Sequence, residues 1–148
     1  MHKTVRYLLL RAALVLPGVI GCVNAMGACS VNASTVAFGN YDVFAATPTD
    51  STGNISVTCD TSTSYSIALS AGSGTISARA LTGTSSTLYY NLYTDPARTL
   101  VWGDGTAGST TVSNTAVSGS HTVYGRIPAG QNVTAGTYSD TLVITVTF

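Results

Sequence analysis

The sequence predicts an all-β sandwich, and three observations carry this prediction. Apolar residues alternate with small hydroxylated ones in several short stretches, which is the period of two of half-buried strands. Thr and Val are frequent in these stretches, whereas clusters of Gly and Ser lie between them and favour turns. No helical periodicity follows the N-terminal segment. Several short strands separated by turns are typical of a sandwich in one domain.

Four alternating stretches precede the C-terminal one. They are residues 53–60, 65–70, 87–94 and 121–127. The link at residues 60–63 suits a hairpin between the first two stretches. Both faces of the third stretch are bulky, so we expect this strand to be covered on both sides. Residues 71–74 and 103–109 are rich in Gly and are expected to form loops.

The C-terminal residues 138–148 show the clearest alternation in the chain. Four large apolar residues fall on one face, namely Leu142, Ile144, Val146 and Phe148. A strand with such a face needs neighbours, because its unpaired N–H and C=O groups form an open edge. Nothing follows Phe148, so the missing neighbour is expected to come from earlier in the chain or from another molecule.

Residues 1–27 have the pattern of a secretory leader. Lys3, Arg6 and Arg11 precede an apolar stretch, and small residues offer cleavage sites after Ala25 or Gly27. The apolar stretch is shorter than the roughly 20 residues that a spanning helix needs. An alternative is a lipobox ending at Cys22, which would make the protein an acylated outer-membrane lipoprotein.

Cleavage after Ala25 leaves two cysteines, Cys29 and Cys59. An even pair in an oxidising compartment favours a disulfide between them. Closing a loop of this length stabilises a fold by about 3 to 4 kcal/mol in the chain-entropy model. Two buried free thiols are the alternative, which export disfavours. Acylation of Cys22 would leave the same pair intact.

The charge of the predicted domain, residues 28–148, excludes some classes of partner. This part has no Lys and no Glu, and its three arginines against six aspartates give a net charge of −3. Without a basic patch to neutralise phosphates, nucleic acid is an implausible partner.

An enzyme is also poorly supported. Asp95, Asp104 and Asp140 are candidate acids by type alone, and His121 is the single histidine in this part. Acid–base and triad chemistry therefore have few possible participants. The Gly-Asp-Gly at residues 103–105 lacks the run of oxygen ligands of a calcium loop. We predict no catalytic residue, metal, cofactor or small-molecule substrate.

Tyr138 stands just before the last expected strand. Immunoglobulin-like sandwiches often place a Tyr at this corner, with its hydroxyl bonded to nearby backbone. The alternative is an ordinary core aromatic at the start of a strand.

Several segments together resemble the spore coat protein U domain family. The resemblance runs in order over nearly all of the predicted domain. Its segments are residues 29–31 (CSV), 37–42 (AFGNYD), 53–59 (GNISVTC), 88–98 (LYYNLYTDPAR), 124–130 (YGRIPAG) and 136–148 (GTYSDTLVITVTF). The family is similar to the pilins of archaic chaperone–usher pili, which serve in attachment and biofilm formation.

The resemblance implies an incomplete immunoglobulin-like β-sandwich that lacks its final strand. In such systems a periplasmic chaperone lends a strand to the open groove, an outer-membrane usher assembles the fibre, and another pilin subunit later supplies the strand. The C-terminal strand would form one wall of this groove and the segment after Cys29 the other. The expected contacts are Leu142, Ile144, Val146 and Phe148, and the expected location is the cell surface.

The chain departs from the pattern of shaft subunits at its N-terminus. After the predicted cleavage only about three residues precede Cys29, too few to span a groove at about 3.3 Å each. We therefore expect a subunit that accepts a strand without donating one, as at a fibre tip. The alternative is a monomeric or laterally packed secreted coat or matrix protein of the same fold; a secreted hydrolase is a distant third.

Overall fold

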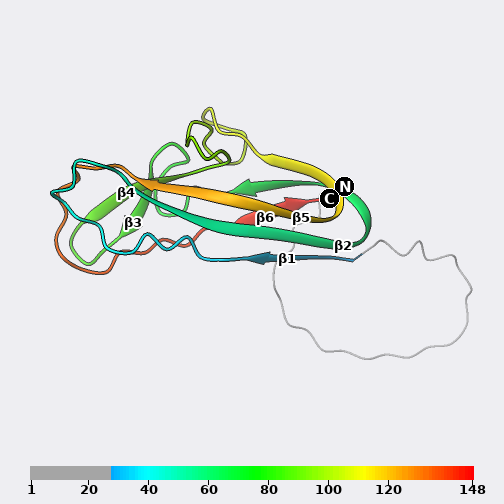
Figure 1. Cartoon of the computed structure of the whole chain (residues 1–148), viewed down its shortest axis with the longest axis horizontal. Helices are drawn as coiled ribbons and strands as arrows, with labels where there is room; N and C mark the ends of the chain where they lie inside the picture. Colours follow the sequence, from blue (N-terminus) through cyan, green and yellow to red (C-terminus); the bar gives the residue numbers. More distant parts are fainter. Residues whose placement is uncertain (1–27) are drawn as a thin grey trace, which may run out of the picture.

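The computed structural model describes residues 28–148, and the predicted leader with Cys22 lies outside the described residues. These residues form six strands and no helix (Figure 1). The strands are β1 (Cys29–Ala33), β2 (Thr49–Leu69), β3 (Arg79–Thr82), β4 (Thr87–Tyr93), β5 (Val112–Ile127) and β6 (Ile144–Thr147). The predicted all-β class is confirmed.

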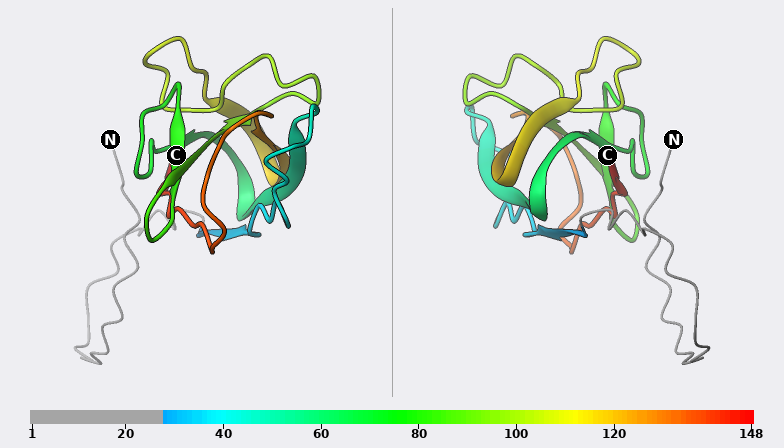
Figure 2. Two further views of the ribbon diagram at one scale, coloured as in Figure 1. Left: turned by 90° about the vertical axis from the view of Figure 1, so that its left-hand side faces the viewer. Right: turned by 90° about the vertical axis from the view of Figure 1, so that its right-hand side faces the viewer.

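Strands β2 and β5 form the frame of the molecule. They pair antiparallel from Thr49 opposite Ile127 to Ile67 opposite Val112, with a register shift between Thr58 and Thr63. At this irregularity the two strands turn over together at one end of the molecule (Figure 1). Strands that switch sheets at a bulge or bend are a known way of building sandwich corners. The result is a sheet that curls round on itself and stays open on one side (Figure 2).

The predicted hairpin at residues 60–63 is wrong in its pairing. The chain does turn there, but the two halves of β2 both pair with β5 and not with each other. A hairpin link would have paired the two halves with each other, whereas an irregularity within a longer strand lets both keep β5 as their partner.

The remaining strands add to this frame at its edges. Strand β1 pairs with the first half of β2, with Cys29 opposite Cys59 and Ala33 opposite Ile55. Strand β6 pairs with the second half of β2, from Leu69 opposite Ile144 to Ser66 opposite Thr147. On the other side β4 pairs with the end of β5, and β3 pairs with β4. Hence β1 and β6 lie along β2 without pairing with each other.

The apolar side chains of the main alternating stretches face the core. The fully buried side chains include Ile55, Val57, Ile67 and Ile127, and Trp102 donates its indole N–H to the Ile67 carbonyl at 3.0 Å. The core is the inner surface of the curled sheet, and its buried hydrophobic members are Ile55, Val57, Cys59, Tyr65, Ile67, Leu69, Leu88, Tyr90, Leu92, Trp102, Val123, Ile127 and Val146.

The strands differ from the sequence prediction in several places. Strand β5 begins at Val112, nine residues earlier than expected, and β3 was not predicted. The last strand begins only at Ile144, although the alternation starts at Tyr138. Alternation shows that a segment is extended and half-buried, but a strand also needs a partner backbone, and residues 139–143 have none along most of their length.

Candidate functional site

An elongated groove opens between residues 33–44 and 133–144, two segments that lie outside the strands except at Ala33, which ends β1, and Ile144, which begins β6. It consists of two adjoining cavities of about 330 Å³ and 770 Å³. The cavities share five lining residues, namely Thr35, Val36, Phe38, Leu81 and Asp140. The groove therefore lies beside the ends of β1 and β6, on the open side of the curled sheet.

The first wall is the chain that follows β1. Ser34 donates its backbone N–H to the Asn54 carbonyl at 2.9 Å, and the Ser51 hydroxyl donates to the Ala37 carbonyl at 2.6 Å. These bonds hold the segment against β2 without a regular ladder. Val36 and Phe38 lie so close to Gly125 that a Cβ there would meet their side chains at 2.8 and 2.7 Å. Glycine at this position lets the wall approach the sheet.

The second wall, residues 139–143, is held by a few separate bonds. Thr82 and Ser139 exchange two backbone hydrogen bonds of 2.8 and 3.1 Å. The Ser70 N–H donates to the Val143 carbonyl at 3.0 Å, and the Val143 N–H donates to the Ser70 hydroxyl at 2.9 Å. This wall is thus extended backbone with much of its hydrogen-bonding capacity free of a strand partner.

The floor of the smaller cavity is apolar. It is formed by side chains from three strands, namely Ile55 and Leu69 of β2, Tyr90 and Leu92 of β4, and Val123 of β5. Phe38 packs edge-on against the Tyr90 ring, with the centroids 5.8 Å apart. An apolar floor between two incompletely paired walls is suited to an extended peptide, whose backbone would meet the walls and whose alternate side chains would meet the floor.

One charged side chain, Asp140, lines the smaller cavity beside this apolar floor. The Asp140 carboxylate accepts a hydrogen bond from the Tyr90 hydroxyl at 2.8 Å and two from Ser73, through its N–H at 3.0 Å and its hydroxyl at 2.9 Å. Burial, with the bond to Asp140, raises the pKa of Tyr90, so its hydroxyl keeps its proton. The pair ties the second wall to the floor and to the loop that follows β2.

The structure places the four predicted groove residues in different surroundings. Leu142 and Ile144 line the smaller cavity. Val146 is 7% exposed and belongs to the core. Phe148 packs against Tyr65, with ring centroids 6.4 Å apart, and lines neither cavity. The contact of a donor strand with any of them stays a prediction.

Tyr138 lies at the outer end of the groove and lines the larger cavity. Its hydroxyl donates to the Thr134 carbonyl at 2.6 Å, four residues upstream, and also contacts the Ser86 hydroxyl. The bond fixes the turn through which the chain enters the second wall.

Cys29 and Cys59 form a disulfide that links the start of β1 to β2. The Ala28 N–H also donates to the Asp60 carboxylate at 3.0 Å. The disulfide therefore anchors β1 at the end remote from the wall at residues 34–38.

The sequence did not indicate two parts of this site. Residues 133–137 line the larger cavity although they belong to no alternating stretch. The sequence marks Asp140 as a candidate acid and gives no sign of its contact with Tyr90, which lies 50 residues away in the chain. The one available signal was a charged residue within an otherwise uncharged alternating segment.

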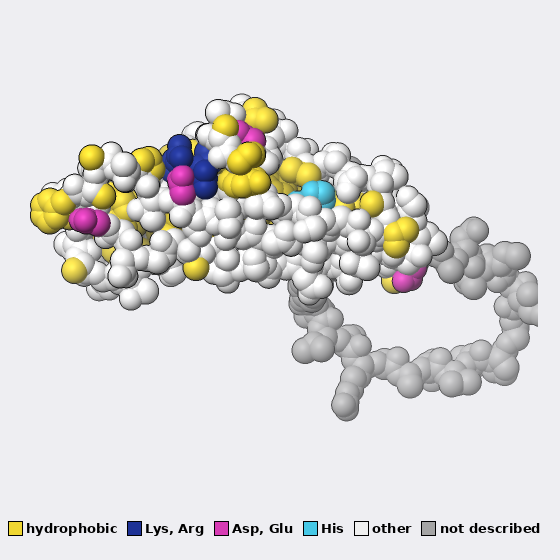
Figure 3. All heavy atoms as spheres, in the orientation of Figure 1, with side chains coloured by type: hydrophobic (Ala, Val, Ile, Leu, Met, Phe, Trp, Pro, Cys, Tyr) yellow, Lys and Arg dark blue, Asp and Glu magenta, His cyan; other side chains and the backbone are white. Residues whose placement is uncertain are grey.

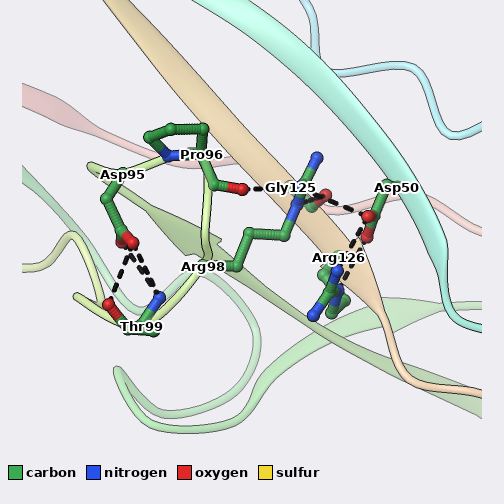
Figure 4. A network of polar contacts seen from close by, with 7 residues as sticks. All are labelled: Asp50, Asp95, Pro96, Arg98, Thr99, Gly125 and Arg126. Carbon is green, nitrogen blue, oxygen red and sulfur yellow. Dashed lines mark hydrogen bonds and ion pairs between the residues drawn. The ribbon is translucent and has the colours of Figure 1, made fainter.

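Charged side chains gather elsewhere, on the face shown in Figure 3. Arg126 binds the Asp50 carboxylate with two hydrogen bonds of 2.7 and 2.8 Å, and Arg98 approaches the same carboxylate at 3.3 Å (Figure 4). Arg98 also donates to the Gly125 carbonyl at 3.2 Å. The hydrogen bond from Arg126 lowers the pKa of Asp50. The charges satisfy one another, which is typical of a structural ion-pair cluster.

The candidate acids Asp95 and Asp104 accept hydrogen bonds within their own turns. Asp95 accepts hydrogen bonds from the Leu100 N–H and from Thr99, which lower its pKa; the bonds from Thr99 are seen in Figure 4. Asp104 accepts from Thr106 in a similar turn. Within residues 28–148 no group of three His, Cys, Asp or Glu side chains is placed to hold a metal ion. The same residues include no helix with the length and hydropathy to cross a membrane.

Comparison with known proteins places these features in a family. The model of the Spore Coat Protein U domain matches residues 20–145. Protein U of Myxococcus xanthus is 34% identical over 143 residues, covering 84% of this chain and 80% of the relative.

A solved structure is similar in fold. It is a chain in the crystal structure of the CsuC–CsuE chaperone–tip adhesion subunit pre-assembly complex, from the archaic chaperone–usher Csu pili of Acinetobacter baumannii. The TM-score is 0.59 and the sequence identity 25%, over 83% of this chain. The match spans 40% of the length of that chain.

Proposed function

Since the chain belongs to the Spore Coat Protein U domain family, we propose that it is a surface pilus or coat subunit whose groove accepts an extended strand from another molecule. Its fold is that of a pilin subunit, and proteins of this kind are structural and not enzymes. Such a family implies passage through the periplasm to the cell surface. The disulfide between Cys29 and Cys59 is in keeping with an oxidising compartment.

The groove between residues 33–44 and 133–144 is the observation that supports this proposal most directly. Its floor is apolar and its walls keep backbone groups free for pairing. A strand with alternating large apolar residues would bury them against the floor, at about 1.5 to 3 kcal/mol gross for each side chain. Backbone hydrogen bonds to both walls would fix the register. Ordering and association costs reduce the net gain.

The partners follow from the same mechanism. The similar solved chain comes from a complex of a chaperone with a tip adhesion subunit. By analogy a periplasmic chaperone would fill the groove first, and a neighbouring subunit would replace it at an outer-membrane usher. The likeness to that complex also favours a tip position and a role in adhesion. Biofilm formation is the further role that we propose for such a fibre.

A pair of neighbouring substitutions tests the groove. Leu142 lines the smaller cavity, whereas Val143 is 63% exposed on the opposite side of the same wall. Leu142→Asp would place an unpaired charge in a dry contact and should abolish capture by a co-expressed chaperone. Val143→Asp should leave capture unchanged. Co-purification of tagged chaperone with each variant measures this.

Equal recovery of both variants would refute the acceptor groove and leave a monomeric or laterally packed coat protein of the same fold as the better interpretation.

Immunogold labelling tests the position in the fibre. Label at fibre ends is expected for a tip subunit, and label spaced along the whole fibre would contradict that position.

A further inference from the structure

Asp140 lies where the two cavities of the groove meet. It is the single charged side chain that lines both of them, within the part of the chain that the structure describes. An extended strand running the length of the groove would therefore pass directly over this carboxylate. The residue of the strand that faces Asp140 must therefore be compatible with a negative charge.

The two carboxylate oxygens of Asp140 differ in their bonding. Oδ1 accepts from the Ser73 N–H, the Ser73 hydroxyl and the Thr141 N–H, at 3.0, 2.9 and 2.9 Å. Oδ2 accepts only from the Tyr90 hydroxyl, at 2.8 Å. Oδ2 also lies close to Gly72, where an added Cβ would clash with it. Each carboxylate oxygen has two lone pairs, so Oδ2 has the capacity to accept one further hydrogen bond, from the side that faces the groove.

Covering this carboxylate with an apolar side chain has an energetic cost. Asp140 is now partly exposed, and an inserted strand would remove its remaining contact with water. A carboxylate taken from water without a replacement hydrogen bond loses much of its solvation free energy. A strand that brings a donor to Oδ2 avoids this loss, whereas an all-apolar strand does not. The carboxylate thereby discriminates between strands.

A neutral donor fits better than a cation. Arg79 is fully buried nearby. Burial lowers its pKa, and the negative charge of Asp140 acts in the opposite direction. The negative charge of Asp140 therefore already has a buried cation within its electrostatic reach. A Lys or Arg on the incoming strand would have to give up its own hydration in the apolar groove for little additional gain.

We propose that the strand which fills this groove carries Ser, Thr, Asn or Gln at the one inward position facing Asp140, between large apolar residues that fill the cavities on either side. This inference rests on the proposed function. It names the chemistry of the partner: an alternating apolar strand with a single hydrogen-bond donor at a fixed register.

Synthetic peptides can test this register. The parent peptide alternates Val with Ser, and in each member of the series one inward Val is replaced by Thr, which has the same shape. Binding to the purified chain is measured by calorimetry. Val→Thr should weaken binding roughly fivefold at ordinary inward positions, since a buried hydroxyl there lacks a partner. At one position it should strengthen binding by about threefold or more.

Two variants assign that position to Asp140. In Asp140→Ala the exceptional position should disappear, so that Thr weakens binding there as elsewhere. In Tyr90→Phe the carboxylate remains and Oδ2 loses its internal donor, so the preference for Thr should persist or increase. If Asp140→Ala does not fold, a crystal structure of the native chain with the preferred peptide tests the contact with Asp140 instead. It should show the Thr hydroxyl within hydrogen-bond distance of Oδ2.

The outcomes separate this inference from the function on which it rests. If none of the peptides binds, the acceptor groove itself is refuted. If the peptides bind but no position favours Thr, or if the favoured position survives Asp140→Ala, the groove stands and the role of Asp140 is refuted. A hydroxyl that points away from Oδ2 in the crystal structure would also refute it.

Discussion

At the scale of single residues, the most unusual feature is a buried arginine. Arg79 is 0% exposed and makes three hydrogen bonds, to the Ser70 carbonyl at 3.0 Å, the Asn91 side-chain oxygen at 2.6 Å and the Trp102 carbonyl at 2.8 Å. Asn91 in turn donates to the Ile76 and Ser77 carbonyls. The guanidinium thus joins the loop after β2 to β4 and to the segment at Trp102.

The geometry of this network predicts that Lys cannot replace Arg79. Lys carries a single ammonium and cannot direct three donors in the planar pattern of a guanidinium. We expect Arg79→Lys to lower the free energy of unfolding by about 2 to 4 kcal/mol, because buried acceptors lose their donors. Arg126→Lys is the control, since it alters an exposed ion pair worth under about 1 kcal/mol. Urea denaturation compares them, and equal losses would contradict the argument.

Gly125 is a second residue whose identity matters for the groove. A Cβ at this position would meet Phe38 at 2.7 Å and Val36 at 2.8 Å, so the first wall would have to move. Gly125→Ala should destabilise the fold by about 1 to 3 kcal/mol, as overpacking does. Gly136→Ala is a matched control, because a Cβ there meets nothing within 4 Å. Thermal unfolding should show a drop for the first variant alone, and a similar drop in both would count against a packed wall.

At the scale of strands, the edges of the sheet differ in how their backbone groups are satisfied. At Tyr89 in β4 the Gln131 side chain takes the place of a neighbouring strand. Its amide accepts from the Tyr89 N–H and donates to the Tyr89 carbonyl, both at 2.8 Å. A side chain that satisfies the backbone in this way protects an edge from strand addition. Along the described walls of the groove, side chains satisfy single backbone groups, such as the Ala37 carbonyl and the Val143 N–H. We infer that these walls are less protected than the edge at Tyr89, which supports strand addition there.

A contact between β2 and β5 also makes the stability of the fold depend on pH. His121 of β5 lies beside Tyr65 of β2, with 2.9 Å between His121 Nε2 and the Tyr65 hydroxyl. Burial lowers the pKa of His121 below its usual 6.5. The unfolded chain therefore takes up a proton first as the pH falls, so stability is lost from about pH 6.5 downwards until the folded-state pKa is passed.

This pH dependence can be measured directly. The free energy of unfolding should be higher at pH 7.5 than at pH 5.5, before the carboxylates begin to titrate. His121→Gln keeps a polar partner for Tyr65 but removes the titrating group, so its stability should change much less between the two values. If the variant shows the same loss as the native chain, another group is responsible.

At the scale of the whole molecule, the open side of the curled sheet makes stability depend on occupancy. A ligand that binds only the folded chain stabilises it by about 2.7 kcal/mol at a concentration 100 times its Kd. An alternating apolar peptide should therefore raise the unfolding temperature in a concentration-dependent way. The same peptide with a central Pro should not, because Pro removes a backbone donor and disturbs the ladder. Equal effects of the two peptides would indicate non-specific binding.

The sequence by itself determined the class of fold and the faces of its main strands. The alternation around Ile55, Ile67 and Leu88 predicts which side chains are buried, because that period is set by the backbone alone. The even pair that the predicted cleavage and export would leave also predicts the pairing of Cys29 with Cys59, and the structure shows this disulfide. These inferences need only local geometry and a count.

Only the tertiary structure decided where the apolar faces go. Leu142 and Val146 share one face of the alternating C-terminal segment, yet Leu142 lines the groove and Val146 is in the core. The turn of β2 with β5, the walls of the groove and the contact of Asp140 with Tyr90 join residues far apart in the chain. An alternation with a period of two predicts that one face of a strand is buried. Which element buries that face depends on long-range pairing, and a local sequence pattern does not encode it.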